Sequence, residues 1–443
     1  MRKLFLVIII VLYSQISQAF DLEVDVLSED YQPISLLISD FYVDDNSAKM
    51  YDSLKTVFSR DIKNSGVFDL RFSYEQILVG NVDLKNAFSE IDISPYNHYQ
   101  YIVVGKINYS AEERSYNIEV SVVNSQGHIL KNVGYNIKSS PSKKEITRLG
   151  HDIANEIYEA ALEIPGYFTS SLLFVDGNRL MMSNYDGEDM EVVLKTRGTI
   201  FAPSFSYDGK MIVYMDFYEG RSEIFLYDVY FKKIMRLANF KGLSLAPSFS
   251  RDNKKIILAV ANEGSTHIYE VSLKSGTIAK LTSGYSINIP GNYSLNNQYV
   301  VFNSDRAGSP KIYTLNPRDG IVNRLSKGIG NYYTPSFAPN SNLILFTKIY
   351  SGDFQIGLLS LSGSEKIVSH DTFAESPSWL VDGRHIVYHY AYKKLKDKNL
   401  YSFYIMDLLS GHKLLIRPTE DAQDPSLSYG VIPTKKISAK YYF

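Results

Sequence analysis

The chain has 443 residues, a formal net charge of −2 at neutral pH and no cysteine. This length allows two or three domains, and 45% hydrophobic residues are enough for a buried core. The lack of cysteine excludes disulfides and thiolate chemistry, and the near-neutral charge gives no reason to expect a nucleic-acid partner.

The N-terminus has the organisation of a secretory signal peptide. Arg2 and Lys3 precede the apolar residues 4–12, and small residues follow at the positions that a signal peptidase reads, ending at Ala19. We therefore predict a signal peptide over residues 1–19, cut between Ala19 and Phe20. A membrane anchor is the alternative, but a spanning helix needs about 20 apolar residues. No other segment is long and apolar enough to span, so we expect the mature protein to be soluble.

Residues 20–165 are predicted to form a small α/β domain. A helix is expected over residues 47–64, where Leu54, Phe58 and Ile62 recur at helical spacing. The sequence Asn64-Ser65-Gly66 then provides a stop, because glycine suits the left-handed position that ends many helices. Strands are expected at residues 34–41, 101–104, 116–123 and 129–137.

A second helix of this domain is expected to begin at Ser142. Glu145 stands three residues later, which is the spacing of a capping box. The helix should run to about Leu162, and Pro165-Gly166 then marks the domain boundary.

The most informative feature of the remaining chain is a repeat of 44 residues. It appears in one series of glycines and one of isoleucines: Gly220, Gly264, Gly308 and Gly352, and Ile224, Ile268, Ile312 and Ile356. In a chain of short strands, a period near 44 residues is typical of β-propeller blades. The alternative is a β-sandwich in which this spacing is a coincidence. Because the glycines and the isoleucines repeat in the same register, a coincidence is a poor explanation.

Each repeat is predicted to be one blade of four strands. Six prolines mark the starts of the repeats: Pro203, Pro247, Pro290, Pro335, Pro377 and Pro425. The sixth repeat has only one strand before residue 430, and its other three strands are expected upstream at residues 171–175, 179–184 and 191–194. We therefore predict a six-bladed β-propeller over residues 166–430, closed by pairing its N- and C-terminal strands.

Two basic segments are expected to be solvated. Residues 393–398 lengthen one hairpin, and residues 431–443 form a C-terminal tail. Charged hairpins and tails of this kind are more often solvent-exposed than part of a binding patch.

The sequence predicts no catalytic residue, metal site or cofactor. It has no G-x-S-x-G, Walker or G-x-G-x-x-G motif. His385 and His389 are four apart on a predicted strand, about 13 Å from each other, which is too far for one metal ion. Asp208, Asp252 and Asp382 recur once per blade, and closing a turn by hydrogen bonds explains them better than a ring of calcium ligands does.

Four segments resemble the TolB family of periplasmic Tol–Pal proteins. They are residues 61–68 (DIKNSGVF), 101–107 (YIVVGKI), 150–158 (GHDIANEIY) and 304–310 (SDRAGSP). The resemblance runs along the whole chain. It departs from the family pattern at two places. Gly291-Asn292-Tyr293 replaces the usual small residue followed by an aromatic, and Leu427 stands where an aromatic is usual.

The resemblance implies a periplasmic adaptor and not an enzyme. Family members bind the outer-membrane lipoprotein Pal and the inner-membrane protein TolA. They support outer-membrane invagination during the cell division cycle and outer-membrane integrity, and some also take part in bacteriocin import. A periplasmic hydrolase, or a propeller that binds a cofactor or calcium, is the alternative.

The expected binding sites follow from blade geometry and from the family. The loops that enter the inner strands line one mouth of a propeller, and the family binds Pal there. The residues expected at this mouth are Ala202, Leu245, Ala246, Asn288, Ile289, Thr334, Glu375 and Ser376. Of these, Ala246 matches a family position closely, and blade geometry places the others.

TolA is expected to bind the start of the mature chain, as in the family. This segment alternates apolar and acidic residues: Phe20, Asp21, Leu22, Glu23, Val24 and Asp25. A free strand of this kind can add to a sheet edge of a partner, although an ordinary disordered terminus has a similar composition.

Overall fold

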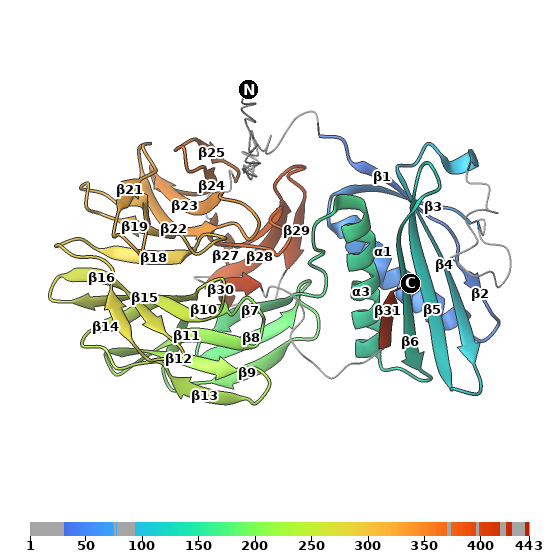
Figure 1. The fold of residues 1–443 in the computed structure, drawn as a ribbon, viewed down its shortest axis with the longest axis horizontal. Helices are drawn as coiled ribbons and strands as arrows, with labels where there is room; N and C mark the ends of the chain where they lie inside the picture. The colour runs from blue at the N-terminus through green and yellow to red at the C-terminus, as the bar shows by residue number, and fades with distance from the viewer. Residues whose placement is uncertain are drawn as a thin grey trace, which may run out of the picture.

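The computed structural model describes residues 31–74, 77, 94–369, 374–395, 398–416, 422–427 and 439–442. In these ranges a small α/β domain lies beside a β-propeller (Figure 1). The predicted signal peptide, its cleavage site after Ala19 and the segment 20–25 lie outside the described residues.

The α/β domain is a mixed sheet with two helices on one face. Its elements are β1 (Ile34–Ile38), β2 (Tyr42–Val43), α1 (Ala48–Asn64), β3 (Phe68–Phe72), the 3-10 helix η1 (Ser94–Tyr96), β4 (Tyr101–Ser110), β5 (Ser115–Asn124), β6 (Ile129–Lys138), α3 (Lys143–Leu162) and β31 (Ala439–Tyr442). The strand order is β3-β1-β4-β5-β6-β31, with β2 on β4. The helices lie between this sheet and the propeller (Figure 1).

Both helix ends that the sequence predicted are confirmed. Ser142 and Glu145 form the capping box of α3, with Glu145 N donating to Ser142 Oγ at 3.2 Å. Gly66 follows α1 with φ of +72°, and a Cβ atom there would lie 2.3 Å from His412 of the propeller. Glycine at this position therefore serves both the turn and the close approach of the two domains.

The C-terminal tail differs from its prediction as a solvated segment. Residues Ala439–Tyr442 form β31, which pairs antiparallel with β6, so that Tyr441 lies opposite Gly134. An edge strand offers unpaired backbone N–H and C=O groups, and the tail covers those of β6.

The propeller has six four-stranded sheets in the described ranges, which confirms the predicted ring. Blade 1 is β10 (Thr199–Phe205), β11 (Met211–Tyr218), β12 (Arg221–Asp228) and β13 (Lys233–Arg236); blade 2 is β14 (Leu243–Phe249), β15 (Lys255–Asn262), β16 (Ser265–Ser272) and β17 (Ile278–Lys280). Blade 3 is β18 (Asn288–Tyr293), β19 (Val300–Ser304), β20 (Lys311–Leu315) and β21 (Val322–Arg324); blade 4 is β22 (Asn331–Phe337), β23 (Ile344–Tyr350), β24 (Asp353–Leu359) and β25 (Glu365–Ile367). Blade 5 is β26 (Ala374–Trp379), β27 (His385–Leu395), β28 (Lys398–Asp407) and β29 (Lys413–Ile416); blade 6 is β30 (Ala422–Leu427), β7 (Ser171–Asp176), β8 (Arg179–Asn184) and β9 (Glu191–Lys195).

The ring closes as predicted, because β30 from the end of the chain pairs with β7 from the start of the propeller. Leu427 lies opposite Leu172, and Gln423 opposite Val175. The strands β27 and β28 are longer than their counterparts, so the described residues 393–395 and 398 do lengthen one blade.

The third repeat begins one residue later than predicted. Tyr293 pairs with the second strand as Phe249 and Phe337 do in the neighbouring blades, so Gly291 and not Pro290 occupies the slot of Pro247 and Pro335. Pro290 attracted the assignment because it is the nearest proline, whereas the 44-residue period passes through residue 291.

The two domains share one hydrophobic core. A single buried cluster contains Leu54 of α1 and Ile157 of α3 together with Phe174, Val387 and Phe403 of the propeller. Domains that share a core in this way are held together by the hydrophobic effect as well as by polar contacts.

Candidate functional site

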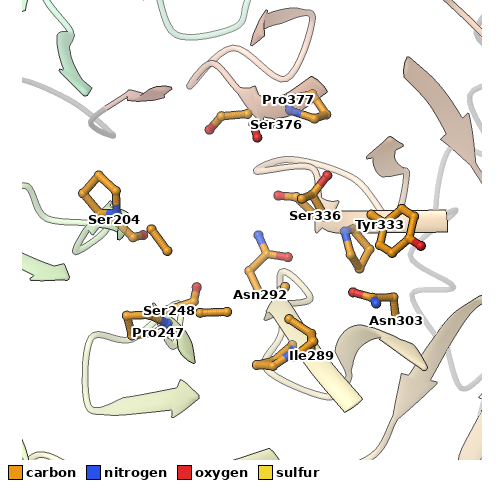
Figure 2. A pocket seen from close by; sticks show the side chains of 18 of the residues that line it. Ser204, Pro247, Ser248, Ile289, Asn292, Asn303, Tyr333, Ser336, Ser376 and Pro377 are labelled. Carbon is orange, nitrogen blue, oxygen red and sulfur yellow. The ribbon is translucent and has the colours of Figure 1, made fainter. Parts of the chain in front are cut away.

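A cavity of about 540 Å³ lies in the central channel of the propeller. Residues from β10, β14, β18, β22 and β26 are among its described lining residues. Figure 2 shows Asn292 between the inner strands, with Ser248 and Ser336 on either side.

The structure brings five of the eight predicted mouth residues together around this cavity. They are Ala202, Ala246, Ile289, Thr334 and Ser376.

The other three predicted residues do not line the cavity. Leu245 packs on the core between blades, and the side chain of Asn288 is fully buried, where it donates to Thr266 O at 2.8 Å. The carboxylate of Glu375 lies 3.4 Å from His389 Nδ1. Successive side chains of a strand point to opposite sides. The sequence did not reveal which of two neighbours, such as Leu245 and Ala246, faces the channel.

Four of the cavity residues have an unusual backbone conformation. Ala202, Ala246, Thr334 and Ser376 have φ angles of +47°, +47°, +48° and +52°. Each stands directly before a proline, at the irregularity in its inner strand. A non-glycine residue in this region costs about 1–3 kcal/mol, and such residues cluster at functional sites. The same strained bulge therefore recurs around the mouth in four blades.

Blade 3 builds this bulge differently. Pro290 occupies the position of Ala246, and its ring fixes φ near −65°. Gly291 follows, where a Cβ atom would lie 1.7 Å from Pro335 O of blade 4. The glycine allows the backbones of blades 3 and 4 to approach more closely than any other residue would permit.

Polar side chains cross the ring at the inner end of the cavity. Asn292 accepts from Phe337 N at 2.7 Å and donates to Phe337 O at 3.1 Å. Arg251, beyond the end of β14, donates to Ala338 O at 2.7 Å, and its guanidinium lies 4.4 Å from the ring centre of Tyr207. Blades 1 to 4 are thus tied together across the channel.

Sequence reasoning missed Asn292 and Arg251 as channel residues. A signal was available for Asn292, since it stands where the other blades have Ser204, Ser248 and Ser336. None was available for Arg251, because its acceptors are backbone carbonyls of blades 3 and 4, which come close only in the folded ring.

The cavity wall carries little charge. Among its described lining residues, Asp305 is the one carboxylate, and its Oδ1 accepts from Ile287 N at 2.8 Å. The wall consists mainly of prolines, aliphatic groups and the hydroxyls of serines. Such a wall suits an uncharged surface of a partner better than a phosphate or a metal ion.

Exposed apolar side chains surround the mouth. They lie in the loops that enter the inner strands and in the hairpins between second and third strands, which share one face of the ring. They are Phe217, Tyr218, Leu243, Tyr285, Ile287, Ile329 and Tyr350. Tyr285 is 97% exposed and Ile329 66% exposed, so these groups are available for contact. Apolar groups concentrated around a hollow are typical of an interaction surface.

The predicted turn aspartates have structural roles. Asp208 accepts from Ser206 Oγ at 2.7 Å, and Asp252 accepts from Ser250 Oγ at 2.7 Å, each within its own hairpin. Within the residues that the structure describes, no group of three His, Cys, Asp or Glu side chains is placed to hold a metal ion.

Asp382, the third turn aspartate, belongs to a buried polar cluster at the domain junction. It accepts from Tyr158 Oη of α3 at 2.9 Å and lies 2.5 Å from His385 Nδ1. His385 Nε2 lies 2.9 Å from Ser65 O at the end of α1. Because a carboxylate and a carbonyl only accept, both ring nitrogens of His385 must donate, and the ring is an imidazolium cation.

The charges of this cluster explain the pKa shifts of its members. Burial opposes the charged form of His385, but the facing Asp382 outweighs it and raises the pKa of the ring. Burial likewise opposes ionisation of Asp407, but its hydrogen bonds to Arg384 and the charge of His385 lower its pKa to about 2. Two ion pairs of blade 5, Asp382 with His385 and Asp407 with Arg384, therefore lie at the domain junction.

Comparison with known proteins assigns the family. A family profile described as the TolB beta propeller domain matches residues 158–428, which is more than half of the chain. The chain belongs to this family. The resemblance noted in the sequence is thereby confirmed.

The curated relatives carry the same family name. The chain is 28% identical over 254 residues to the Tol-Pal system protein TolB of Wigglesworthia glossinidia brevipalpis, covering 54% of this chain and 56% of the relative. It is 26% identical over 253 residues to that of Hahella chejuensis, covering 55% of this chain and 57% of the relative. The chain thus aligns with about half the length of these relatives.

A solved structure supports the fold over most of the chain. The crystal structure of TolB from Acinetobacter baumannii matches with a TM-score of 0.72, 24% sequence identity, and coverage of 90% of this chain and 97% of that one. Within the described ranges, no helix combines the length and apolar character needed to cross a bilayer.

Proposed function

We propose that this protein is a non-enzymatic periplasmic adaptor of the Tol–Pal system that binds Pal at the propeller mouth. The observation that carries the proposal is the cavity of about 540 Å³ with its rim of exposed apolar side chains, in a member of the TolB propeller family. The relatives' name, Tol-Pal system protein TolB, supplies the identity of the partner system.

The chemistry of the cavity favours a polypeptide partner over a substrate. Protein interfaces combine an apolar centre with scattered hydrogen-bonding groups, which describes this wall. No histidine occurs among its described lining residues, so its serines have no neighbouring base of the kind that activates a nucleophile. These features speak against the hydrolase alternative, and the single carboxylate Asp305 speaks against calcium.

The proposal assigns TolA binding to the mature N-terminus, Phe20 to Asp25. Its support is the alternation of apolar and acidic residues, which fits strand addition to a partner sheet. With a signal peptide over residues 1–19, an α/β domain over 20–165 and a propeller over 166–430, the protein would connect the two partners through different domains. The corresponding role is support of outer-membrane invagination at division and of outer-membrane integrity, with bacteriocin import as a second use of the same surface.

The test is binding of residues 20–443 to the soluble domain of the host's Pal, measured by titration calorimetry. Ala246→Arg places a long cation on the cavity wall and should abolish binding. Ser275→Arg is the matched control, because Ser275 is exposed in the β16–β17 turn on the opposite face and should leave binding unchanged.

Each outcome is informative. Equal binding by wild type and Ala246→Arg would refute the mouth as the site. Failure of the unsubstituted protein to bind Pal would refute the adaptor role, and turnover or a tightly held ion in the purified protein would then favour the alternative.

A further inference from the structure

A smaller cavity lies at the junction of the two domains. It encloses about 100 Å³ where α3 passes the end of blade 6. The helix side is formed by Lys144, Arg148 and His151, and the blade side by Thr169, Ser171, Met182, Ser183, Asn184, Asp189 and Glu191. The described lining residues of this cavity and of the channel cavity do not overlap.

Helical spacing brings the three basic residues to one face. Lys144, Arg148 and His151 are separated by four and three positions, which stacks their side chains along one side of α3. Lys144 is exposed, Arg148 is half-buried and His151 is only 2% exposed, so the basic groups lead from solvent into the junction.

His151 is held in a fixed orientation with one nitrogen unused. Its Nδ1 lies 2.5 Å from Asp61 Oδ2, and the other oxygen of Asp61 accepts from Tyr185 Oη at 2.7 Å. The Nε2 atom is buried and has no hydrogen-bond partner among the described residues. Burial opposes the charged form of His151, but Asp61 outweighs it and raises the pKa of the ring. In the protonated ring Nε2 is a buried donor without a partner, which is uncommon in folded proteins, and an accepting group would satisfy it.

The blade side adds one neutral donor. Thr169 Oγ1 accepts from Asn155 Nδ2 at 2.6 Å, so its own hydroxyl proton remains available for a ligand. Ser183 donates to Asn184 O at 2.9 Å and fixes the strand end that forms the wall.

Two carboxylates lie at the rim. Asp189 and Glu191 are exposed, whereas His151 is buried. Water and salt weaken the interaction of exposed charges much more than that of buried ones. The rim carboxylates therefore reduce the attraction for an anion without cancelling it.

We propose that this cavity binds a tetrahedral oxyanion, either inorganic phosphate or the phosphate of a small monoester, between α3 and blade 6. The donor set combines an ammonium, a guanidinium and an imidazole, which are the groups that proteins use for phosphate. The cavity volume is well below the roughly 300–1,000 Å³ of sites for larger ligands, so the cavity can enclose only a small group such as a phosphate. Because its two sides come from different domains, the bound anion would link them. This inference does not depend on the Tol–Pal role.

The experiment measures the thermal midpoint of residues 20–443 against inorganic phosphate, sn-glycerol 3-phosphate and acetate at constant ionic strength. We expect a saturable rise with the phosphates and none with acetate, since ligands that bind only the folded state raise its midpoint. A response to inorganic phosphate alone would identify the free ion as the ligand, and an equal response to the ester would identify the phosphate group.

Variants separate this site from general salt effects. Arg148→Ala should weaken phosphate binding about tenfold or more, since a hydrogen bond to a charged group is lost. Lys143→Ala, one residue outside the lining on the same helix, should leave it unchanged. Glu191→Gln should strengthen binding, because it removes a rim carboxylate.

Three results would overturn the proposal: no saturable response to either phosphate, equal responses in wild type and Arg148→Ala, or weaker binding by Glu191→Gln. The ¹⁵N shift of His151 Nε2 provides a second readout, and it should move on addition of phosphate even if Arg148→Ala proves unstable.

Discussion

Removal of the Asp382 charge should weaken the junction of the two domains far more than the same change in another blade. Asp382 is fully buried and accepts hydrogen bonds from Tyr158 Oη, Arg384 N and His385 N at 2.9, 3.0 and 3.0 Å. Asp382→Asn keeps an acceptor for the turn but leaves the imidazolium of His385 buried without its counter-ion. Breaking a buried ion pair from one side costs about 3–5 kcal/mol.

The repeat supplies a matched control. Asp208 closes the equivalent turn of blade 1, but its side chain is 38% exposed and its ion pair is with the exposed Lys210 at 3.2 Å. Exposed pairs contribute about 0–1 kcal/mol, so Asp208→Asn should change the free energy of unfolding by that much at most.

The assay is urea denaturation followed by tryptophan fluorescence. The chain has one tryptophan, Trp379, which is 1% exposed and donates to Ser336 O at 2.9 Å. It lies three residues from Asp382 and therefore reports on this blade. Similar midpoints for Asp382→Asn and Asp208→Asn would refute the assignment of a buried ion pair to the junction.

Three further outcomes are expected. Gly291→Ala should lower the thermal midpoint of unfolding, because its Cβ atom would lie 1.7 Å from Pro335 O; an unchanged midpoint would show that blades 3 and 4 can separate without cost. Stability should depend on pH at both ends: His385 has a raised pKa, so its contribution is complete below its ordinary value of 6.5 and is lost as pH rises through the raised value. Asp407 has a pKa lowered from 3.8 to about 2, so its contribution is complete above 3.8 and is lost as pH falls through about 2; urea midpoints that stay constant from pH 2 to 9 would contradict both assignments. Ser142→Ala removes the cap of α3 and should cost about 0.5–2 kcal/mol, measured by circular dichroism, whereas Ser142→Asp should retain most of the stability.

The fold was predictable because the repeat is an internal comparison. Glycines and isoleucines at one spacing identify equivalent positions without any second sequence, and the closing strand followed from counting strands. The third repeat was placed one residue early because proline was taken as its marker. The 44-residue period, which Gly291 obeys, is the better guide there.

For the channel cavity, the sequence predicted the mouth of the propeller but not the individual residues that line it. Entering loops must line the mouth, but the bulge in each inner strand interrupts the alternation of side chains, so Leu245 and Ala246 could not be told apart. Arg251 and Asn292 form contacts with blade 4 that depend on the closed ring. The strand β31 was missed because four residues are too few to show a period.

Ring closure also determines when this protein can finish folding. Blade 6 takes its inner strand, β30, from residues Ala422–Leu427 and its other strands from residues that precede all the other blades. A chain that is synthesised from its N-terminus delivers the inner strand of blade 6 after the other strands of that blade. Until then blade 6 has an open edge, and the contact that closes it is among the most distant in sequence, which favours slow folding. Any chaperone that protects this chain while it folds would therefore be needed longest at β7, which pairs with β30 only at the end.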